Sequence, residues 1–166
     1  MPLTPTAPTI EQVIAAIPAW TGRSVRAERI AAGLTNENWR VEVDGEPRFV
    51  RIPGGATDLL AVDRANERHN TRAAATAGVG PAVLHELPDW DVFVLEWVDG
   101  RTMSNEAFQA PDAPARVAAA LRRLHAGPRF RDDFDMFRLS ERYLAVVDER
   151  SITIPAGYRD RLPRLP

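Results

Sequence analysis

Arg51 has the charge and the strand position of a residue that binds an anion. All 21 basic residues of the chain are arginines, so any side chain that binds phosphate as a cation must be an arginine. Arg51 stands between Val50 and Ile52 in an apolar run, and the two-residue period of a β-strand turns its side chain away from both. A charged side chain in such a run either extends to water from an edge strand or pairs with an opposite charge. The functional interpretation is a cation directed at nucleotide phosphates, with Phe49 on the same face able to cover a base.

Glu67 is the candidate partner of Arg51. It lies on a predicted helix that follows the strand, and Thr71 and Ala74 share its face, where their small size would let the helix approach the sheet. Taken alone, Glu67 is typical of a solvated helix residue. A glutamate on this helix paired with a cation on the preceding strand is, however, the arrangement that orients a phosphate-binding side chain in kinases.

A loop of small and amide-bearing residues, Gly-Leu-Thr-Asn-Glu-Asn, occupies positions 33–38. Gly33 would let the backbone fold closely over a ligand, and Thr35 and Asn36 carry donors suited to phosphate oxygens. The same composition is typical of an ordinary turn between strands. The loop therefore supports a phosphate site only in combination with Arg51 and Glu67.

The elements that must position these residues can be predicted from hydrophobic period and turn residues. Thr9 and Gln12 have capping-box spacing, Asp44-Gly45 is a strong hairpin signal, and Asp63 and Gly78 are suitable helix caps. The predicted strands are 24–31, 38–43, 48–52, 82–87 and 92–97, and the predicted helices are 9–18, 63–77, 114–125 and 139–149.

The order of these elements predicts an α+β fold. A five-stranded antiparallel sheet with one crossing helix comes first, and Asp99-Gly100 separates it from the first helices of a mostly helical region. We expect an N-terminal extension over 1–22, a sheet-containing lobe over 23–98, and a hinge with an incomplete helical lobe over 99–166.

Composition excludes several classes of function. Hydrophobic residues make up 45% and charged residues 27% of the 166 residues, as in globular proteins. The net charge is −2, and the sequence has no basic stripe of the kind that binds nucleic acid. With no cysteine, disulfides and thiolate catalysis are excluded. The N-terminus lacks the pattern of a signal peptide or membrane helix, so we expect a cytoplasmic protein without nucleic-acid or membrane partners.

Several runs together resemble one known family. Gly33-Leu34-Thr35-Asn36, the run 49–54 and Asn66-Glu67, followed by Gly-Val-Gly-Pro at 78–81, are similar to the N-terminal lobe of choline and ethanolamine kinases. Those enzymes share the protein-kinase-like fold of the aminoglycoside phosphotransferases. The likeness continues through Leu-Arg-Arg-Leu-His at 121–125 and an aromatic stretch from Phe130, and it spans 24–147.

The resemblance implies a role for each candidate residue and implies ATP and Mg²⁺ as cofactors. The loop would cover the ATP phosphates, Arg51 would contact them while Glu67 holds it in place, and the backbone of a hinge would bind adenine. The predicted nucleotide-binding residues are Gly33, Leu34, Thr35, Asn36, Asn38, Phe49, Arg51, Glu67, Glu96, Trp97 and Val98.

The catalytic segment of that family is not found in the sequence. The family carries a His-x-Asp…Asn loop and a later acidic metal-binding segment, but none of His69, His85 and His125 has an aspartate two positions on. We therefore expect no catalytic residue and no metal ligand in this chain, with both falling after Pro166. On this interpretation the chain is a fragment that does not catalyse phosphoryl transfer by itself.

The acidic cluster of Asp132, Asp133 and Asp135 is interpreted as a solvated loop. It precedes the expected position of the catalytic loop and lacks the glycine of the kinase metal motif. Phe134 and Phe137 are expected to anchor it.

The leading functional hypothesis is ATP-dependent phosphorylation of the hydroxyl of a small cationic alcohol, choline or ethanolamine. Thiamine kinase is an alternative, because its glycine loop also resembles Gly-Leu-Thr-Asn. Aminoglycoside kinase is disfavoured, since those enzymes normally keep lysine at the position of Arg51. A non-catalytic nucleotide-binding or interaction module is an alternative of another class.

An incomplete helical lobe should leave apolar side chains uncovered. The predicted helices place Val117, Leu121, Leu124, Tyr143 and Val146 on inward faces. We expect this surface to seek burial, by forming a homodimer or by aggregating.

Overall fold

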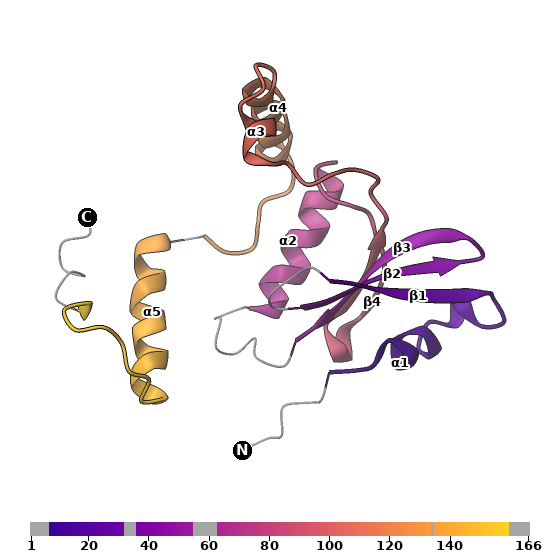
Figure 1. The fold of residues 1–166 in the computed structure, drawn as a ribbon, viewed down its shortest axis with the longest axis horizontal. Coiled ribbons are helices and arrows are strands. Elements are labelled where there is room, and N and C mark those ends of the chain that lie inside the picture. Colours follow the sequence, from indigo (N-terminus) through magenta and orange to yellow (C-terminus); the bar gives the residue numbers. More distant parts are fainter. Residues whose placement is uncertain (1–6, 32–35, 55–62, 134, 160–166) are drawn as a thin grey trace.

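The computed structural model describes residues 7–31, 36–54, 63–133 and 135–159, and side chains except those of 136 and 137. Its centre is a five-stranded antiparallel sheet with the order β1-β2-β3-β5-β4 (Figure 1). The strands are β1 Val25–Ile30, β2 Asn36–Val43, β3 Glu46–Pro53, β4 Val83–Leu87 and β5 Val92–Glu96. The helices are α1 Ile10–Ala15, α2 Arg64–Thr76, α3 Asn105–Phe108, α4 Ala113–Ala126 and α5 Met136–Glu149, with 3₁₀ turns η1 Pro18–Trp20 and η3 Pro88–Trp90. The α+β class is confirmed.

The β2–β3 hairpin has the tight turn predicted from its sequence. Asp44 and Gly45 both have positive φ, 52° and 85°, which is the backbone of a type I′ turn. Val43 therefore pairs with Glu46, and this register sets every later pair along the two strands.

One face of the sheet packs against the N-terminal segment. Thr9 begins α1 with the predicted capping box, in which its backbone N–H donates to Gln12 Oε1 at 2.8 Å and its hydroxyl accepts from Gln12 N–H at 3.3 Å. The side chains of this segment and of the sheet form one buried core, which comprises Ile10, Val13, Ile17, Trp20, Val41, Val43, Val50, Ile52, Val92 and Val94. Burial of Val50 and Ile52 here turns the odd-numbered residues of β3 to the opposite face.

The helix α2 lies on that opposite side, next to β4, and its Glu67 reaches Arg51 of β3. Asp63 caps it by accepting from the N–H of Asn66 at 2.9 Å, and this hydrogen bond is the main cause of the lowered pKa of Asp63. The helix ends at Thr76, and Gly78 follows with a φ of 66°, the left-handed conformation predicted for it.

The segment after α4 is attached to α2. His69 Nε2 lies 3.0 Å from the carbonyl oxygen of Arg129, and the N–H of Arg131 donates to Asn70 Oδ1 at 3.0 Å. Gly127 approaches α2 so closely that an added Cβ would lie 2.6 Å from the Cβ of Ala77. These contacts attach the segment between α4 and α5 to the helix that carries Glu67.

The remaining helices make fewer contacts with the sheet. In Figure 1, α3 and α4 stand beyond one end of α2, and α5 lies apart from the sheet. The helix α3 was not predicted; it is four residues long and begins at the N-cap Ser104. No helix in the part of the chain that the structure describes is long and apolar enough to cross a bilayer.

Candidate functional site

Arg51 and Glu67 meet between β3 and α2. Nη2 of Arg51 lies 3.0 Å from Oε1 of Glu67, an ion-pair distance, although the nitrogen is not aligned for a hydrogen bond. The two side chains are only 22% and 21% exposed. The Cζ atom of Arg51 also lies 4.9 Å from the ring centroid of Phe93, its cross-strand neighbour on β5, within the range of a cation–π contact.

Arg64 is a second cation on the same carboxylate. Its Nη1 donates to Oε2 of Glu67 at 2.6 Å, and its side chain is 16% exposed. Each oxygen of Glu67 therefore faces a different arginine. Nη2 of Arg64 is buried and has no hydrogen-bond partner in the described part of the chain, as is true of Nη2 of Arg51.

The electrostatics of Arg51 reflect this crowding. Burial is the main cause of its lowered pKa, the charge of Glu67 opposes the shift, and the like charge of Arg64 adds to it. Two guanidinium groups share one carboxylate, so the cluster formed by Arg51, Glu67 and Arg64 has a net positive charge and more donors than acceptors. An anionic group with several oxygens fits this cluster, because buried donors without acceptors are costly.

Cross-strand register places further predicted residues on the face of Arg51. Asn38 pairs with Arg51 and Arg40 pairs with Phe49, so Asn38 and Phe49 lie on that face, and Asn36 follows at the same two-residue period. Asn36 Oδ1 is buried without a partner among the described residues. The predicted loop residues Gly33, Leu34 and Thr35 lie outside the described residues.

The predicted hinge begins at Glu96, the last residue of β5, and the amide of this residue is already hydrogen-bonded. The N–H of Glu96 donates to the carbonyl oxygen of Ala82 at 2.9 Å. This N–H is therefore not available to a ligand. Trp97 donates from Nε1 to Asp99 Oδ1 at 3.0 Å. The centroid of its ring lies 5.3 Å from the Cζ of Arg40. Val98 is 64% exposed in an irregular segment.

The described acidic residues after α4 are exposed or bonded to arginines. Asp132 and Asp133 are exposed, Asp133 forms an exposed ion pair with Arg129, and Asp135 accepts from the N–H of Arg138 at the start of α5. In the described part of the chain, no cluster of three acidic or histidine side chains could hold a cation. These residues therefore do not fit a magnesium site. The side chains of Phe134 and Phe137, predicted to anchor this segment, are outside the description.

Arg64 and Phe93 are the site residues that sequence reasoning missed. Arg64 stands three positions before Glu67, and the i,i+3 spacing on a helix was a signal that both side chains share a face. Phe93 could not be connected to Arg51 without the pairing of β3 with β5, which strands so far apart in the sequence do not reveal.

The comparisons with known proteins identify the family and the fold of the chain. Residues 26–163 match the model of the phosphotransferase enzyme family, APH. A solved choline/ethanolamine kinase family protein from Mesorhizobium loti is 39% identical, with a TM-score of 0.69. The choline kinase from Cryptosporidium parvum Iowa II is 17% identical, with a TM-score of 0.66, and supports the fold alone. No curated protein matched the chain.

This chain belongs to the APH phosphotransferase family and has its kinase-like fold. The two alignments cover 92% and 94% of the chain but only 49% of each of those structures, so the chain spans about half the length of these relatives.

Proposed function

We propose that this chain is the ATP-binding part of a small-molecule kinase. The observation that carries the proposal is the ion pair of Arg51 with Glu67 at 3.0 Å, on the sheet face that also holds Asn38 and Phe49. ATP would supply the phosphoryl group that is transferred. Arg51 would bind its phosphates, Glu67 would hold Arg51 against α2, and Phe49 with the backbone of Trp97 and Val98 would receive adenine.

The substrate proposed is choline or ethanolamine. The support is the 39% identity to a choline/ethanolamine kinase family protein, together with an arginine rather than a lysine at position 51. Thiamine and aminoglycosides are the alternative substrates, and a module that binds nucleotide without catalysis is the alternative function. We place the catalytic loop and the magnesium ligands in the part of the relatives that this chain does not match. A cytoplasmic location stays a prediction from the sequence.

Substrate class is tested in a protein of the relatives' length that carries this chain. We expect ATP consumption to depend on choline or ethanolamine, and to be far slower with thiamine or an aminoglycoside. The Arg51→Ala variant is the control for hydrolysis unrelated to this site. If thiamine or an aminoglycoside is the better acceptor, the proposed substrate is wrong. If ATP binds but no acceptor stimulates its consumption, the non-catalytic module is favoured.

A further inference from the structure

Arg64 and Arg51 face the same carboxylate, that of Glu67. Nη1 of Arg64 holds Oε2 of Glu67 at 2.6 Å, and this contact leaves Oε1 directed at Arg51. The Glu67 carboxylate has two oxygens, and each is engaged by one arginine. If Arg64 were removed, the carboxylate could rotate and offer both oxygens to Arg51 as a two-point pair, as arginine and carboxylate groups prefer.

Such a two-point pair would neutralise Arg51 and tie its donors to Glu67. With Arg64 present, Glu67 is shared, and the cluster keeps a surplus positive charge. The buried Nη2 atoms of Arg51 and Arg64 have no acceptors in the described part of the chain, so the cluster as a whole has donors to spare. An oxygen-rich anion beside Arg51 would meet that surplus.

We propose that Arg64 is a positioning residue that keeps Glu67 from neutralising Arg51 and thereby makes the site select nucleotides by their phosphate charge. This inference rests on the proposed nucleotide site. It adds Arg64 to that site. It also predicts a measurable property of the site, the preference for ATP over adenosine.

The test is the affinity of the 166-residue chain for ATP and for adenosine, measured by calorimetry. Arg64→Gln should weaken ATP binding by about tenfold, the range expected when a charge-assisted hydrogen bond is lost, and should leave adenosine binding unchanged. Arg64→Lys, which keeps the charge and one donor to Oε2, should restore most of the ATP affinity.

The matched control is Arg72→Gln. Arg72 lies on the same helix, but its guanidinium pairs with Glu86 on β4, at 2.7 Å from Nε to Oε1, and it takes no part in the cluster. This variant should bind both ligands as the unchanged chain does.

Several outcomes would overturn this inference or the proposed function. Unchanged ATP affinity in Arg64→Gln, or equal losses for ATP and adenosine, would overturn the inference, because a purely structural role would not discriminate between the two ligands. An Arg64→Lys variant no better than Arg64→Gln would also overturn it. If Arg51→Gln weakens ATP binding while Arg64→Gln does not, only this inference fails. If neither variant alters ATP affinity, the proposed function itself fails.

Discussion

Glu67 is shared by two arginines that are both largely removed from water. The exposed fractions of Arg51, Glu67 and Arg64 are 22%, 21% and 16%, so the charges are partly desolvated and each depends on the others. In an exposed pair such as Arg138 with Glu141, 68% and 57% exposed, water screens both charges. The same chemical change should therefore have different consequences at these two places.

Replacing Glu67 with Ala should lower the free energy of unfolding by about 2 kcal/mol, because two partly buried arginines lose their shared counter-charge. The matched Glu141→Ala variant should change it by less than about 0.5 kcal/mol. Urea unfolding followed by circular dichroism measures both. Equal losses in the two variants would show that the cluster is no more desolvated than the surface.

At this scale, the sequence predicts some contacts and misses others. The alternation of Val50, Arg51 and Ile52 was sufficient to place Arg51 opposite the core. The pairing of Glu67 with Arg51 was predicted from the strand–helix arrangement of kinases, because spacing along the helix does not say what Glu67 faces. The third member, Arg64, shares the face of Glu67, but spacing alone does not say which carboxylate oxygen it will hold. Phe93 depends on strand pairing between distant segments, for which local sequence carries no signal.

At the scale of elements, α2 is the part that connects the sheet to the helical region. One side of it presents Glu67 to β3, and the other end meets Gly127 and the segment after α4. The turns and caps around it were predictable, because Asp63 and Gly78 have direct chemical reasons to occupy those positions. The close approach of Gly127 to Ala77 could not be predicted, because these residues are 50 positions apart in the sequence.

Gly127→Ala should lower the free energy of unfolding by about 1–3 kcal/mol. The φ of Gly127 is −82°, so the backbone itself accepts alanine, and the cost comes from a Cβ placed 2.6 Å from the Cβ of Ala77. Removing that opposing methyl group in the double variant Gly127→Ala/Ala77→Gly should recover part of the loss. Thermal unfolding of the single variants and the double variant measures this coupling, and strictly additive losses would contradict the contact.

The strand order was also beyond the sequence. The five strands were predicted to within about two residues of their observed ends because period and turns are local properties. Insertion of β5 between β3 and β4 is a matter of long-range pairing. The short helix α3 escaped prediction because four residues are too few to show a helical period.

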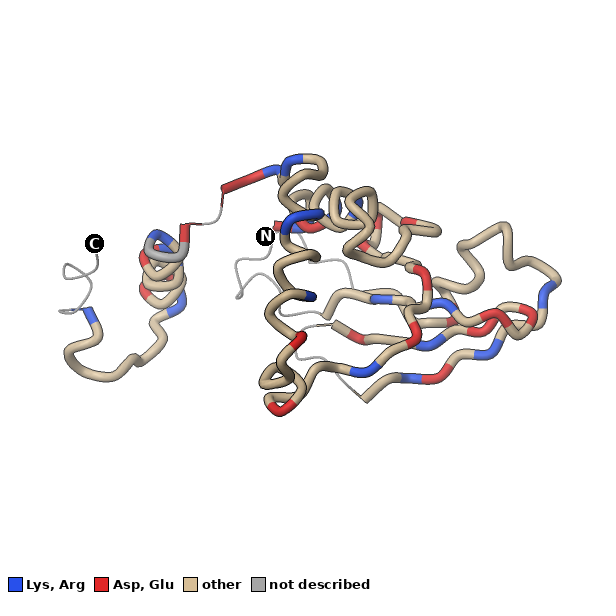
Figure 2. Tube along the Cα trace, turned by 90° about the horizontal axis from the view of Figure 1, so that it is seen from above, with Lys and Arg blue, Asp and Glu red and all other residues tan. Residues whose placement is uncertain are grey.

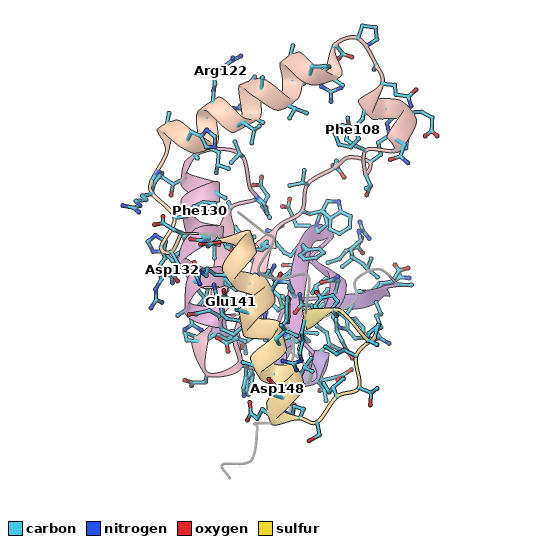
Figure 3. The ribbon with its side chains drawn as sticks, turned by 90° about the vertical axis from the view of Figure 1, so that its left-hand side faces the viewer. Phe108, Arg122, Phe130, Asp132, Glu141 and Asp148 are labelled. Atoms are coloured by element: carbon cyan, nitrogen blue, oxygen red, sulfur yellow. The ribbon has the colours of Figure 1, made fainter. Side chains whose placement is uncertain are left out.

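At the scale of the whole molecule, exposed apolar side chains gather on the helical region. Phe108, Val117 and Leu121 are 54%, 40% and 47% exposed. A shallow open hollow between α3 and α4 is lined by Phe108, Ala113, Pro114, Val117, Ala118 and Leu121. In Figure 3, α3 with Phe108 and α4 with Arg122 stand clear of the sheet and of α5.

The surface of the sheet has a different character. Figure 2 shows blue and red positions interspersed along the described strands, which fits the balance of 21 basic and 23 acidic residues. A surface of mixed charge does not favour self-association. We therefore expect the chain to self-associate through the exposed apolar side chains of α3 and α4.

The chain should self-associate as its concentration rises, and Leu121→Glu should shift it toward monomer because a charge would then face that apolar surface. Sedimentation velocity over a concentration series measures the effect, and Arg122→Glu, adjacent on α4, serves as the control for added negative charge. A chain that is monomeric at every concentration would contradict the expectation.

The central claim is that this molecule binds ATP through Arg51, and the direct test is the ATP affinity of the 166-residue chain with and without that side chain. Arg51→Ala should weaken ATP binding by about 100-fold, since it removes a partly buried cation from the proposed phosphate site. Arg72→Ala, which removes an arginine of α2 outside the site, should leave the affinity unchanged. Equal ATP affinity in the Arg51→Ala variant and the unchanged chain would contradict the account.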